Sequence, residues 1–295
     1  MNADFFETQR PTLLGIAYRI LGSRADAEDA VQDTFVRWQG VDPTTIDNPG
    51  AWLTSTCTRR CIDLLRAAHK SRTEYVGTWL PEPLETPETG PEEKASLASS
   101  LTTAFLLVLE RLTPKERAAY LLHEIFDVSY PDVARSLDIA EPACRKLVSR
   151  ARANVEREHV RYVPPRSRQE ELLAAFTSAV VDGDAAMLTR MLAVDAELAV
   201  DSGGKVPSLR ETLHGRSQVL AFVSESLRSY WKDYRLHGAT LYGAAGFVVR
   251  HGDAVVASVS FAYDQEGRAT RVFIVRNPDK LARLGATEDD RADRS

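Results

Sequence analysis

Basic side chains are concentrated in two separated stretches of this sequence. Residues 59–72 hold five Lys or Arg residues against one acid, and residues 145–161 hold six against two. Clustered guanidinium and ammonium groups bind the phosphates of a polyanion, with an affinity that falls as the salt concentration rises. Because the whole chain carries a net charge of −5, the two clusters predict two local contacts with a polyanion rather than a general attraction to anions.

The segment between these clusters has the opposite character. Residues 74–93 contain no Lys or Arg and include four prolines, with the stretch W-L-P-E-P at 79–83. Two prolines flank Glu82 and keep the backbone extended there, as in a linker. Trp79 and Leu80 are unusual in such a segment. They predict an anchor that docks the linker on a folded surface.

The N-terminal part of the chain is predicted to be helical. Apolar residues at helical spacing indicate a helix up to Leu21, and Ser23 with Asp26 indicates the start of the next one. The segment 26–38 buries an apolar side and presents an acidic and amidic side. A further helix starts at Ala51 and ends in the first basic cluster.

The second basic cluster follows two helix-start signals, T-P-K-E at 113–116 and S-Y-P-D at 129–132. Each combines a capping hydroxyl with a proline in the first turn. The short helix from the second signal is followed by three residues, 138–140, and by a basic helix that begins at Glu141. This is the pattern of a helix-turn-helix, whose second helix enters the major groove of DNA.

The character of the chain changes after the two prolines at 164–165. The pattern predicts helices at 168–181, 184–192 and 217–231, and strands within 197–206, 235–243, 247–263 and 269–276. Glycine-containing turns at 202–204 and 251–253 fit hairpins. Helices followed by an antiparallel sheet with one long helix describe an α+β domain.

Composition limits the functional classes. No apolar run approaches the ~18 residues of a membrane span, and the N-terminus lacks the pattern of a signal peptide. Three cysteines, Cys57, Cys61 and Cys144, argue against a disulfide framework, and no set of side chains has metal-ligand spacing. We therefore expect a protein of the reducing cytoplasm that has no contact with a membrane, no metal and no cofactor.

The motifs in the first half of the chain resemble those of a known family. The first helical block resembles the −10-binding domain of bacterial sigma factors of the extracytoplasmic-function (ECF) group. The residues that carry this resemblance are D-A-E-D-A-V-Q-D-T-F-V-R-W at 26–38, N-P-G-A-W-L at 48–53 and I-D-L-L-R at 62–66. The second block resembles the −35-binding domain through L-T-P-K-E-R at 112–117, Y-P-D-V-A at 130–134 and the helix at 141–155.

The remainder resembles a SnoaL-like domain, of the cone-shaped α+β barrel type shared with ketosteroid isomerases. One subgroup of ECF sigma factors carries such a domain. The chain resembles that subgroup at W-L-P-E-P (79–83), D-S-G-G-K-V (201–206) and N-P-D-K-L (277–281). Ser202 stands where glycine is usual, and we expect a small effect. The expected fold is thus multidomain, with two all-α sigma domains and a C-terminal α+β cone-shaped barrel.

Domain boundaries follow from these patterns. We expect sigma region 2 at 1–73, an acidic Pro-rich linker at 74–100, the helix-turn-helix of sigma region 4 at 101–162, a SnoaL-like regulatory domain at 167–284 and a disordered tail at 285–295.

The resemblance implies a sigma factor that binds core RNA polymerase, through the clamp helices of the β′ subunit and through the β subunit, and directs it to promoter DNA. Polymerase contacts are expected at Asp29, Gln32, Asp33 and Arg37. Contacts with the −10 element are expected at Asn48, Trp52, Arg59, Arg60, Arg66 and Lys70, and contacts with the −35 element at Arg145, Lys146, Ser149 and Arg150. A solvated helix face remains the alternative for the polymerase set, and core packing the alternative for Trp52.

For the C-terminal domain, the resemblance implies regulation within the same chain, in place of a separate anti-sigma factor. The expected regulatory contacts are Trp79, Leu80, Pro81, Glu82, Pro83, Asp201, Gly203, Gly204, Lys205, Asn277, Pro278, Asp279, Lys280 and Leu281. A local tuck of Trp79 against the sigma helices is the alternative to docking on the C-terminal domain.

Two other functions remain open. The barrel could sense a small ligand or be a residual isomerase or hydrolase, with candidate groups at Asp182, Asp184, Asp201, His214, Tyr242, His251 and Tyr263. We do not expect an enzyme, because most of these residues flank turns and the chain has no nucleophile elbow or phosphate loop. A plain DNA-binding repressor needs only the helix-turn-helix and leaves the motifs at 26–38 and 48–66 unexplained.

Overall fold

The computed structural model describes residues 2–73, 75–86, 99–158 and 162–284, without the side chains of residues 2, 43 and 68–73. The chain forms two compact units, residues 1–74 with 106–158 and residues 75–105 with 159–295. The start of the predicted linker therefore belongs to the same unit as the C-terminal domain. The predicted tail at 285–295 and the linker residues 87–98 lie outside the described residues.

Three helices build the first part of unit one. They are α1 (Asn2–Leu21), α2 (Arg24–Gln39) and α3 (Pro49–Thr73), with a short 3₁₀ turn η1 (Pro43–Thr45) before α3. As predicted, α2 begins after Ser23, whose hydroxyl accepts a hydrogen bond from the Asp26 N–H at 3.2 Å. Apolar side chains such as Leu13, Val31 and Leu53 are fully buried between these helices.

The second part of unit one contains the helix-turn-helix. Its elements are α5 (Thr103–Leu109, which crosses the boundary between the units), α6 (Pro114–Tyr120), the π-helical η2 (Leu121–Ile125), α7 (Tyr130–Leu137) and α8 (Glu141–Arg157). Thr113 and Glu116 form the predicted capping box of α6, and Ser129 caps α7. Asp138 ends α7 with a left-handed φ of 51°. The tight turn to α8 follows directly.

Arg19 and Arg117 of this unit are buried. Arg117 is 2% exposed and donates to the carbonyl oxygens of Leu109 and Ile20, at 2.8 and 2.7 Å. It also pairs with Glu110 at 2.7 Å. Burial lowers the pKa of Arg19 to about 10. Since Ile20 lies in the last turn of α1, Arg117 links α1 to the helix-turn-helix through groups that have lost their hydration.

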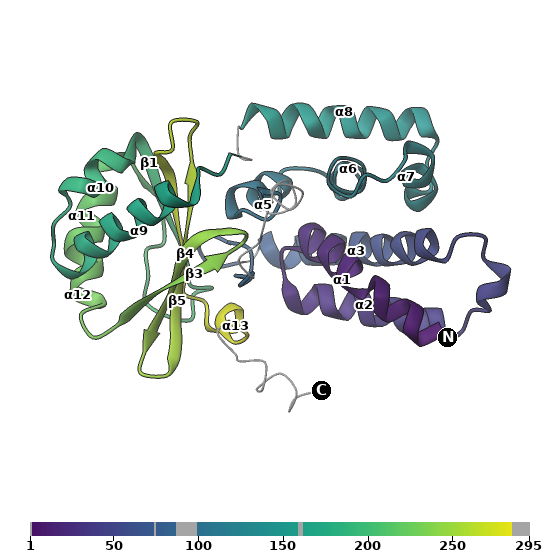
Figure 1. Ribbon diagram of the computed structural model, residues 1–295, viewed down its shortest axis with the longest axis horizontal. Helices are drawn as coiled ribbons and strands as arrows, with labels where there is room; N and C mark the ends of the chain where they lie inside the picture. Colours follow the sequence, from purple (N-terminus) through teal and green to yellow (C-terminus); the bar gives the residue numbers. More distant parts are fainter. Residues whose placement is uncertain (1, 74, 87–98, 159–161, 285–295) are drawn as a thin grey trace. The chain divides into compact units, whose positions relative to one another are not determined.

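Unit two is an α+β domain (Figure 1). Its helices are α9 (Arg166–Val181), α10 (Ala186–Met191), α11 (Arg216–Ala221), η3 (Phe222–Leu227), α12 (Arg228–Tyr230) and α13 (Pro278–Leu281). Its strands are β1 (Leu192–Asp201), β2 (Leu213–His214), β3 (Arg235–Leu241), β4 (Ala244–His251), β5 (Ala254–Tyr263) and β6 (Ala269–Val275), in the order β2-β1-β6-β5-β4-β3. Helices α9–α12 cover one face of the sheet, where Phe176 packs against Phe247 and Phe261.

Two details of this domain differ from the sequence predictions. The sheet is mixed rather than antiparallel, because β1 pairs with β6 in parallel. The expected hairpin at 202–204 is wrong: the chain turns there, but residues 202–212 separate β1 from β2. Pairing between distant strands and the length of an irregular connection are not marked by local turn residues. The hairpin at 251–253 does join β4 to β5 directly, and Gly252 has the left-handed φ of +59° that such a turn requires.

Three further observations concern the cysteines, metal-binding clusters and membrane-spanning helices. Cys57, Cys61 and Cys144 are free and buried, and burial raises the pKa of the Cys61 thiol. Among the described residues, no cluster of His, Cys, Asp and Glu could hold a metal ion. Within the same ranges, every helix is too short or too polar to traverse a bilayer.

Candidate nucleic-acid interface and linker clamp

The carboxylate of Asp201, the last residue of β1, is the centre of a polar cluster in unit two. It is completely buried. Oδ1 accepts hydrogen bonds from the Tyr75 hydroxyl at 2.6 Å and from the Gly203 N–H at 3.1 Å. Oδ2 accepts from the Leu80 N–H at 2.8 Å and from Lys280 Nζ at 2.7 Å. A buried carboxylate needs such partners because they replace its lost hydration.

Lys280 completes the cluster. Its Nζ donates to the carbonyl oxygen of Leu80 at 2.5 Å, in addition to Asp201. The same nitrogen lies 4.5 Å from the centroid of the Trp79 ring and 5.0 Å from that of Tyr75. The Lys280 side chain is only 13% exposed, and cation–π attraction is strongest for a desolvated cation. We call Tyr75, Trp79, Leu80, Asp201 and Lys280 the linker clamp.

The close approach of the linker requires two glycines. Gly203 and Gly204 have φ of +57° and +71°, in the left-handed region that favours glycine. A Cβ on Gly203 would lie 2.5 Å from Nδ2 of Asn277, and one on Gly204 would lie 3.0 Å from Cγ1 of Val76. Ser202 is not among the residues with positive φ. Ser202 therefore does not occupy the left-handed backbone conformation that favours glycine.

Asn277 connects the third segment to the clamp. It is 4% exposed, and its Nδ2 donates to the Tyr75 hydroxyl at 2.8 Å. Its Oδ1 accepts from the Asp279 N–H at 3.1 Å and so caps α13, while its own N–H donates to the Asp201 carbonyl at 3.0 Å. Lys205 and Asp279 form an ion pair at the rim, where their side chains are 49% and 66% exposed.

Sequence reasoning missed the contribution of two tyrosines. Tyr75 is not among the predicted contacts, and the sequence marks Tyr242 only as a candidate catalytic group. The Tyr242 hydroxyl donates to the Pro81 carbonyl at 2.9 Å, and its N–H donates to the Leu84 carbonyl at 2.9 Å. Burial raises the pKa of both tyrosines well above the usual range, and the bond to Asp201 adds to the shift of Tyr75. An aromatic residue four positions before Trp79 was the available signal.

The structure therefore brings together the three segments 79–83, 201–206 and 277–281. Within the first, Leu80, Pro81, Glu82 and Pro83 are buried and Trp79 is partly buried. Beyond them, the N–H of Thr86 donates to the edge strand β3 at 2.9 Å. In the last segment Leu281 is buried, whereas Pro278 is exposed at the start of α13.

The predicted polymerase face lies on α2. Asp29, Gln32 and Arg37 are exposed. Asp33 differs, because its Oδ2 pairs with Nε of Arg60 on α3 at 2.6 Å. A residue predicted to contact polymerase is thus paired with one predicted to contact DNA, a connection that spacing along one helix does not show.

Two of the residues predicted to contact the −10 element have local structural roles. Asn48 is exposed, and its Oδ1 accepts from the Ala51 N–H at 3.0 Å, which caps α3. Trp52 is partly buried, and its ring centroid lies 5.5 Å from that of the buried Trp38. Packing fixes Trp52 while leaving part of its ring accessible.

The cations of α3 are not equally available. Arg59 donates from Nε to the Ser136 carbonyl at 2.9 Å and from Nη2 to the Arg135 carbonyl at 2.7 Å. These carbonyls lie in the last turn of α7, at the negative end of the helix dipole. Arg66 is exposed and lies 3.6 Å from a carboxylate one turn earlier. Lys70 belongs to α3, and its side chain is outside the described part of the structure.

The four residues predicted to contact the −35 element are all exposed on α8: Arg145, Lys146, Ser149 and Arg150. Arg145 pairs with Glu141 at 2.6 Å, and Arg150 lies 3.9 Å from Glu116. The opposite side of α8 is buried through Cys144, Val148 and Ala151. The helix thus presents its basic side as one accessible surface.

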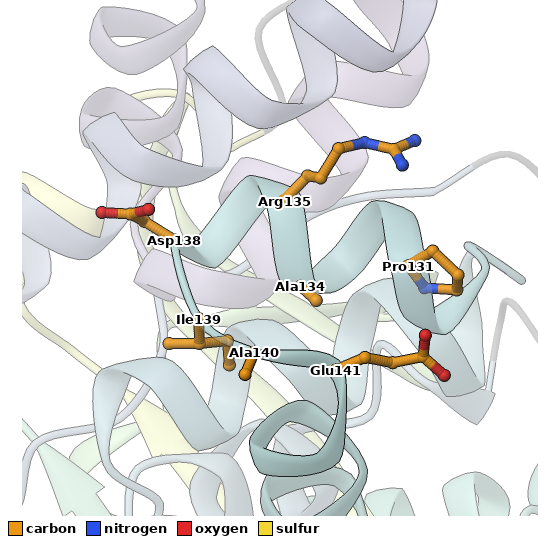
Figure 2. A pocket seen from close by; sticks show the side chains of 7 residues that line it. All are labelled: Pro131, Ala134, Arg135, Asp138, Ile139, Ala140 and Glu141. Carbon is orange, nitrogen blue, oxygen red and sulfur yellow. The ribbon is translucent and has the colours of Figure 1, made fainter.

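An open hollow of about 580 Å³ lies over the turn of the helix-turn-helix (Figure 2). Its lining comes from α7, the turn and the start of α8: Pro131, Ala134, Arg135, Asp138, Ile139, Ala140 and Glu141. The hollow therefore borders the end of α8 that a recognition helix directs towards base edges.

Comparison with known proteins places this arrangement in a family. The family model Sigma-70 region 2 matches residues 5–71, and Sigma-70, region 4 matches residues 102–155. The chain is 32% identical, over 299 residues, to the ECF RNA polymerase sigma factor SigJ of Mycobacterium tuberculosis, covering 95% of this chain and 93% of SigJ. This chain belongs to the ECF family of RNA polymerase sigma factors.

Two further likenesses agree with this assignment. The crystal structure of M. tuberculosis SigJ aligns with a TM-score of 0.72 and 30% identity, covering 96% of this chain and 98% of SigJ. The ferric citrate uptake sigma factor FecI of Escherichia coli is 31% identical over 138 residues, which is 45% of this chain and 76% of FecI. The ECF sigma factor thus has the expected helical sigma regions, followed by a mixed-sheet domain shared with SigJ.

An ECF sigma factor acts with core RNA polymerase in promoter recognition, and the relatives are transcription factors rather than enzymes. The candidate catalytic groups are dispersed accordingly. Asp182 and Asp184 flank the turn after α9, His214 pairs with Glu197 at 3.1 Å, and His251 lies beside Tyr234. Asp201, the candidate acid among them that is completely buried, accepts hydrogen bonds from two residues of the linker, Tyr75 and Leu80.

Proposed function

We propose that this ECF sigma factor contacts the −10 element through α3 and the −35 element through α8, and that its C-terminal domain modulates transcription in cis through the linker clamp. The accessible basic side of α8 supports the −35 role. The exposed residues of α2 support contact with polymerase at Asp29, Gln32 and Arg37. Asp33 belongs to the same proposed polymerase contacts, although its carboxylate pairs with Arg60 in this structure.

The observation that carries the regulatory proposal is the seating of the linker on the C-terminal domain. The clamp holds Leu80 by both its N–H and its carbonyl, through Asp201 and Lys280. The linker is also the covalent connection between helices α1–α3 and the helix-turn-helix. A segment that is fixed to a domain no longer contributes its length to the reach of a flexible connection. Clamping therefore changes the distance over which the two promoter-binding regions can separate.

The consequence for activity is a shift in population. A sigma factor engages both promoter elements only while its two DNA-binding regions are suitably spaced. A linker that is held or released changes the fraction of molecules with that spacing, without changing any DNA-contacting residue. In this proposal the C-terminal domain fills the role that a separate anti-sigma factor has elsewhere, and it acts in the cytoplasm.

The test uses two lysines that lie near each other on the domain but differ in burial. Lys280→Met removes the cation of a pair whose side chains are 13% and 0% exposed, whereas Lys205→Met removes one from the exposed rim pair. Breaking a buried pair costs about 3–5 kcal/mol, whereas an exposed pair is worth ~0–1 kcal/mol. Holoenzyme is assembled from core RNA polymerase and each full-length variant. Initiation is measured on a promoter that the parental holoenzyme selects from a random library, and protease cleavage within 75–86 reports release of the linker.

We expect Lys280→Met to accelerate cleavage of the linker and to change the initiation rate, while Lys205→Met, at a predicted contact whose ion pair is exposed, changes both much less. A linker that is released without any change in initiation rate or in affinity for polymerase would overturn regulation in cis. The assignment to the family would be untouched by that result.

A further inference from the structure

Arg145 is held by two neighbours at the start of the recognition helix. Its Nε and Nη2 donate to Oε1 of Glu141, at 3.0 and 2.6 Å. Its Cζ lies 4.2 Å from the centroid of the Tyr130 ring. That ring is in turn stacked on His123, with the centroids 3.8 Å apart. A guanidinium on an exposed side chain is thus fixed both along one edge and on one face.

The arrangement leaves one edge of the guanidinium for recognition. An arginine can form paired hydrogen bonds from its Nε–Nη2 edge or from its Nη1–Nη2 edge. Glu141 occupies the first edge. Among the described residues, Nη1 of Arg145 donates to no partner. The second edge has the hydrogens that O6 and N7 of guanine accept in the major groove.

We propose that Glu141 is a positioning residue that orients Arg145 for reading a guanine in the −35 element, and that it thereby determines specificity. This inference rests on the proposed −35 role of α8. Glu141 touches no base in this mechanism. It selects one rotamer of Arg145 before DNA arrives, so less side-chain freedom is lost on binding.

The proposal predicts opposite effects on specific and random DNA. Fixing one rotamer-rich side chain is worth roughly 2- to 10-fold in affinity, and this gain is made only where Arg145 finds its guanine. The carboxylate itself repels phosphate, so a neutral residue at this position should bind random DNA at least as well as the parent does. The ratio of the two affinities therefore falls.

A purely structural role for Glu141 predicts a different result. As the first residue of α8, its charge also favours the helix N-terminus. Loss of that effect would weaken specific and random binding together. Glu141→Asp separates the two roles, because aspartate keeps the charge in the first turn but is one methylene too short to hold Arg145 in the same way.

The experiment measures binding by holoenzyme that is assembled from core RNA polymerase and full-length sigma factor. The probe is a −35 duplex that the parental holoenzyme selects from a random library, together with every single base-pair substitution of it and a random duplex. The variants are Glu141→Asp, Glu141→Gln and Arg145→Ala. Glu156→Gln serves as the control, because it removes one exposed carboxylate further along α8.

We expect Arg145→Ala to abolish discrimination at one G·C pair. Glu141→Asp and Glu141→Gln should reduce discrimination at that same pair by roughly 2- to 10-fold, with unchanged or tighter binding of the random duplex for Glu141→Gln. Glu156→Gln should discriminate as the parent does. If Arg145→Ala relaxes one position while both Glu141 variants keep parental discrimination there, the positioning role is wrong and the readout by Arg145 stands. If Arg145→Ala relaxes no position, both are wrong.

Discussion

The two helices that carry the predicted DNA cations, α3 and α8, hold them in different ways. On α8, Arg145 and Arg150 face the side chains of glutamates, and both arginines are more than half exposed. On α3, Arg59 donates to two backbone carbonyls at the end of α7. Exposed pairs between side chains are worth ~0–1 kcal/mol and are weakened by salt. They leave both arginines accessible on the surface of α8.

The contacts of Arg59 differ from these. The carbonyls of Arg135 and Ser136 do not move unless α7 moves. Arg59 therefore connects α3 to the helix-turn-helix, whereas the basic side chains of α8 stay accessible. A cation that the sequence predicts to contact DNA can therefore be exposed for that contact, or it can already be hydrogen-bonded to the backbone of another helix. The bonding partners of each cation separate these cases, whereas charge in the sequence does not.

The largest effect should come from the buried link between the two parts of unit one. Arg117→Met leaves Glu110 and two carbonyl groups without their donor. We expect unit one to lose about 3–5 kcal/mol, because these groups lose a buried and charged donor. The measurement is urea unfolding, followed by hydrogen exchange of the amides in α1 and α6. Arg111→Met is the matched control, since Arg111 pairs with Glu158 while 61% exposed and should cost less than about 1 kcal/mol.

Equal losses for Arg117→Met and Arg111→Met would show that burial does not distinguish these arginines. A buried arginine would then link the two parts of unit one no more strongly than an exposed ion pair does.

Local chemistry was the part of this fold that the sequence predicted well. The hydroxyls of Ser23, Thr113 and Ser129 cap helices where the pattern indicated, and Gly252 forms its hairpin. Each of these features depends on residues within a few positions of one another. The family motifs extended the prediction to whole domains, because each motif spans one such local structure.

Pairing over long distances could not be predicted in the same way. The family resemblance, and not any local spacing, predicts a regulatory contact at Asp201, whose partners Tyr75 and Leu80 lie 126 and 121 positions away. The parallel pairing of β1 with β6 was missed for the same reason. Apart from the family motifs, Trp79 and Leu80 indicated a contact, since apolar side chains in a charged, proline-rich segment need a surface to cover them.

The same limit affected the DNA-binding residues. The sequence assigned Arg59 and Arg60 to phosphate contacts, and Asp33 to polymerase. Nothing in the spacing indicated that Arg60 pairs with Asp33, or that Arg59 reaches α7. Their predicted roles therefore stay predictions, which variants on α3 can now test against variants on α8.

A smaller effect is expected from the link between α3 and α7. Arg59→Ala removes two hydrogen bonds from a charged donor, and we expect a local loss of about 1–2 kcal/mol. Hydrogen exchange should accelerate in the last turn of α7. Lys146→Ala on α8 is the control, because an exposed side chain without such contacts changes stability by less than about 0.5 kcal/mol. If the hydrogen exchange of α7 is unchanged in Arg59→Ala, these hydrogen bonds do not hold Arg59, and its side chain is available to contact DNA.

The smallest expected effect concerns Arg60, which lies between the two cases. Its partner Asp33 is a side chain, as on α8, but Arg60 is only 34% exposed, as is typical of an engaged group. If it binds a phosphate of the −10 region, Arg60→Ala should reduce the slope of log affinity against log salt by about 0.7–0.9, similarly for promoter and random DNA. Asp33→Asn should instead leave the slope as in the parent and raise affinity slightly, since it releases Arg60 without removing it. An unchanged slope for Arg60→Ala would place Arg60 with Arg59, as a cation that the fold has already engaged.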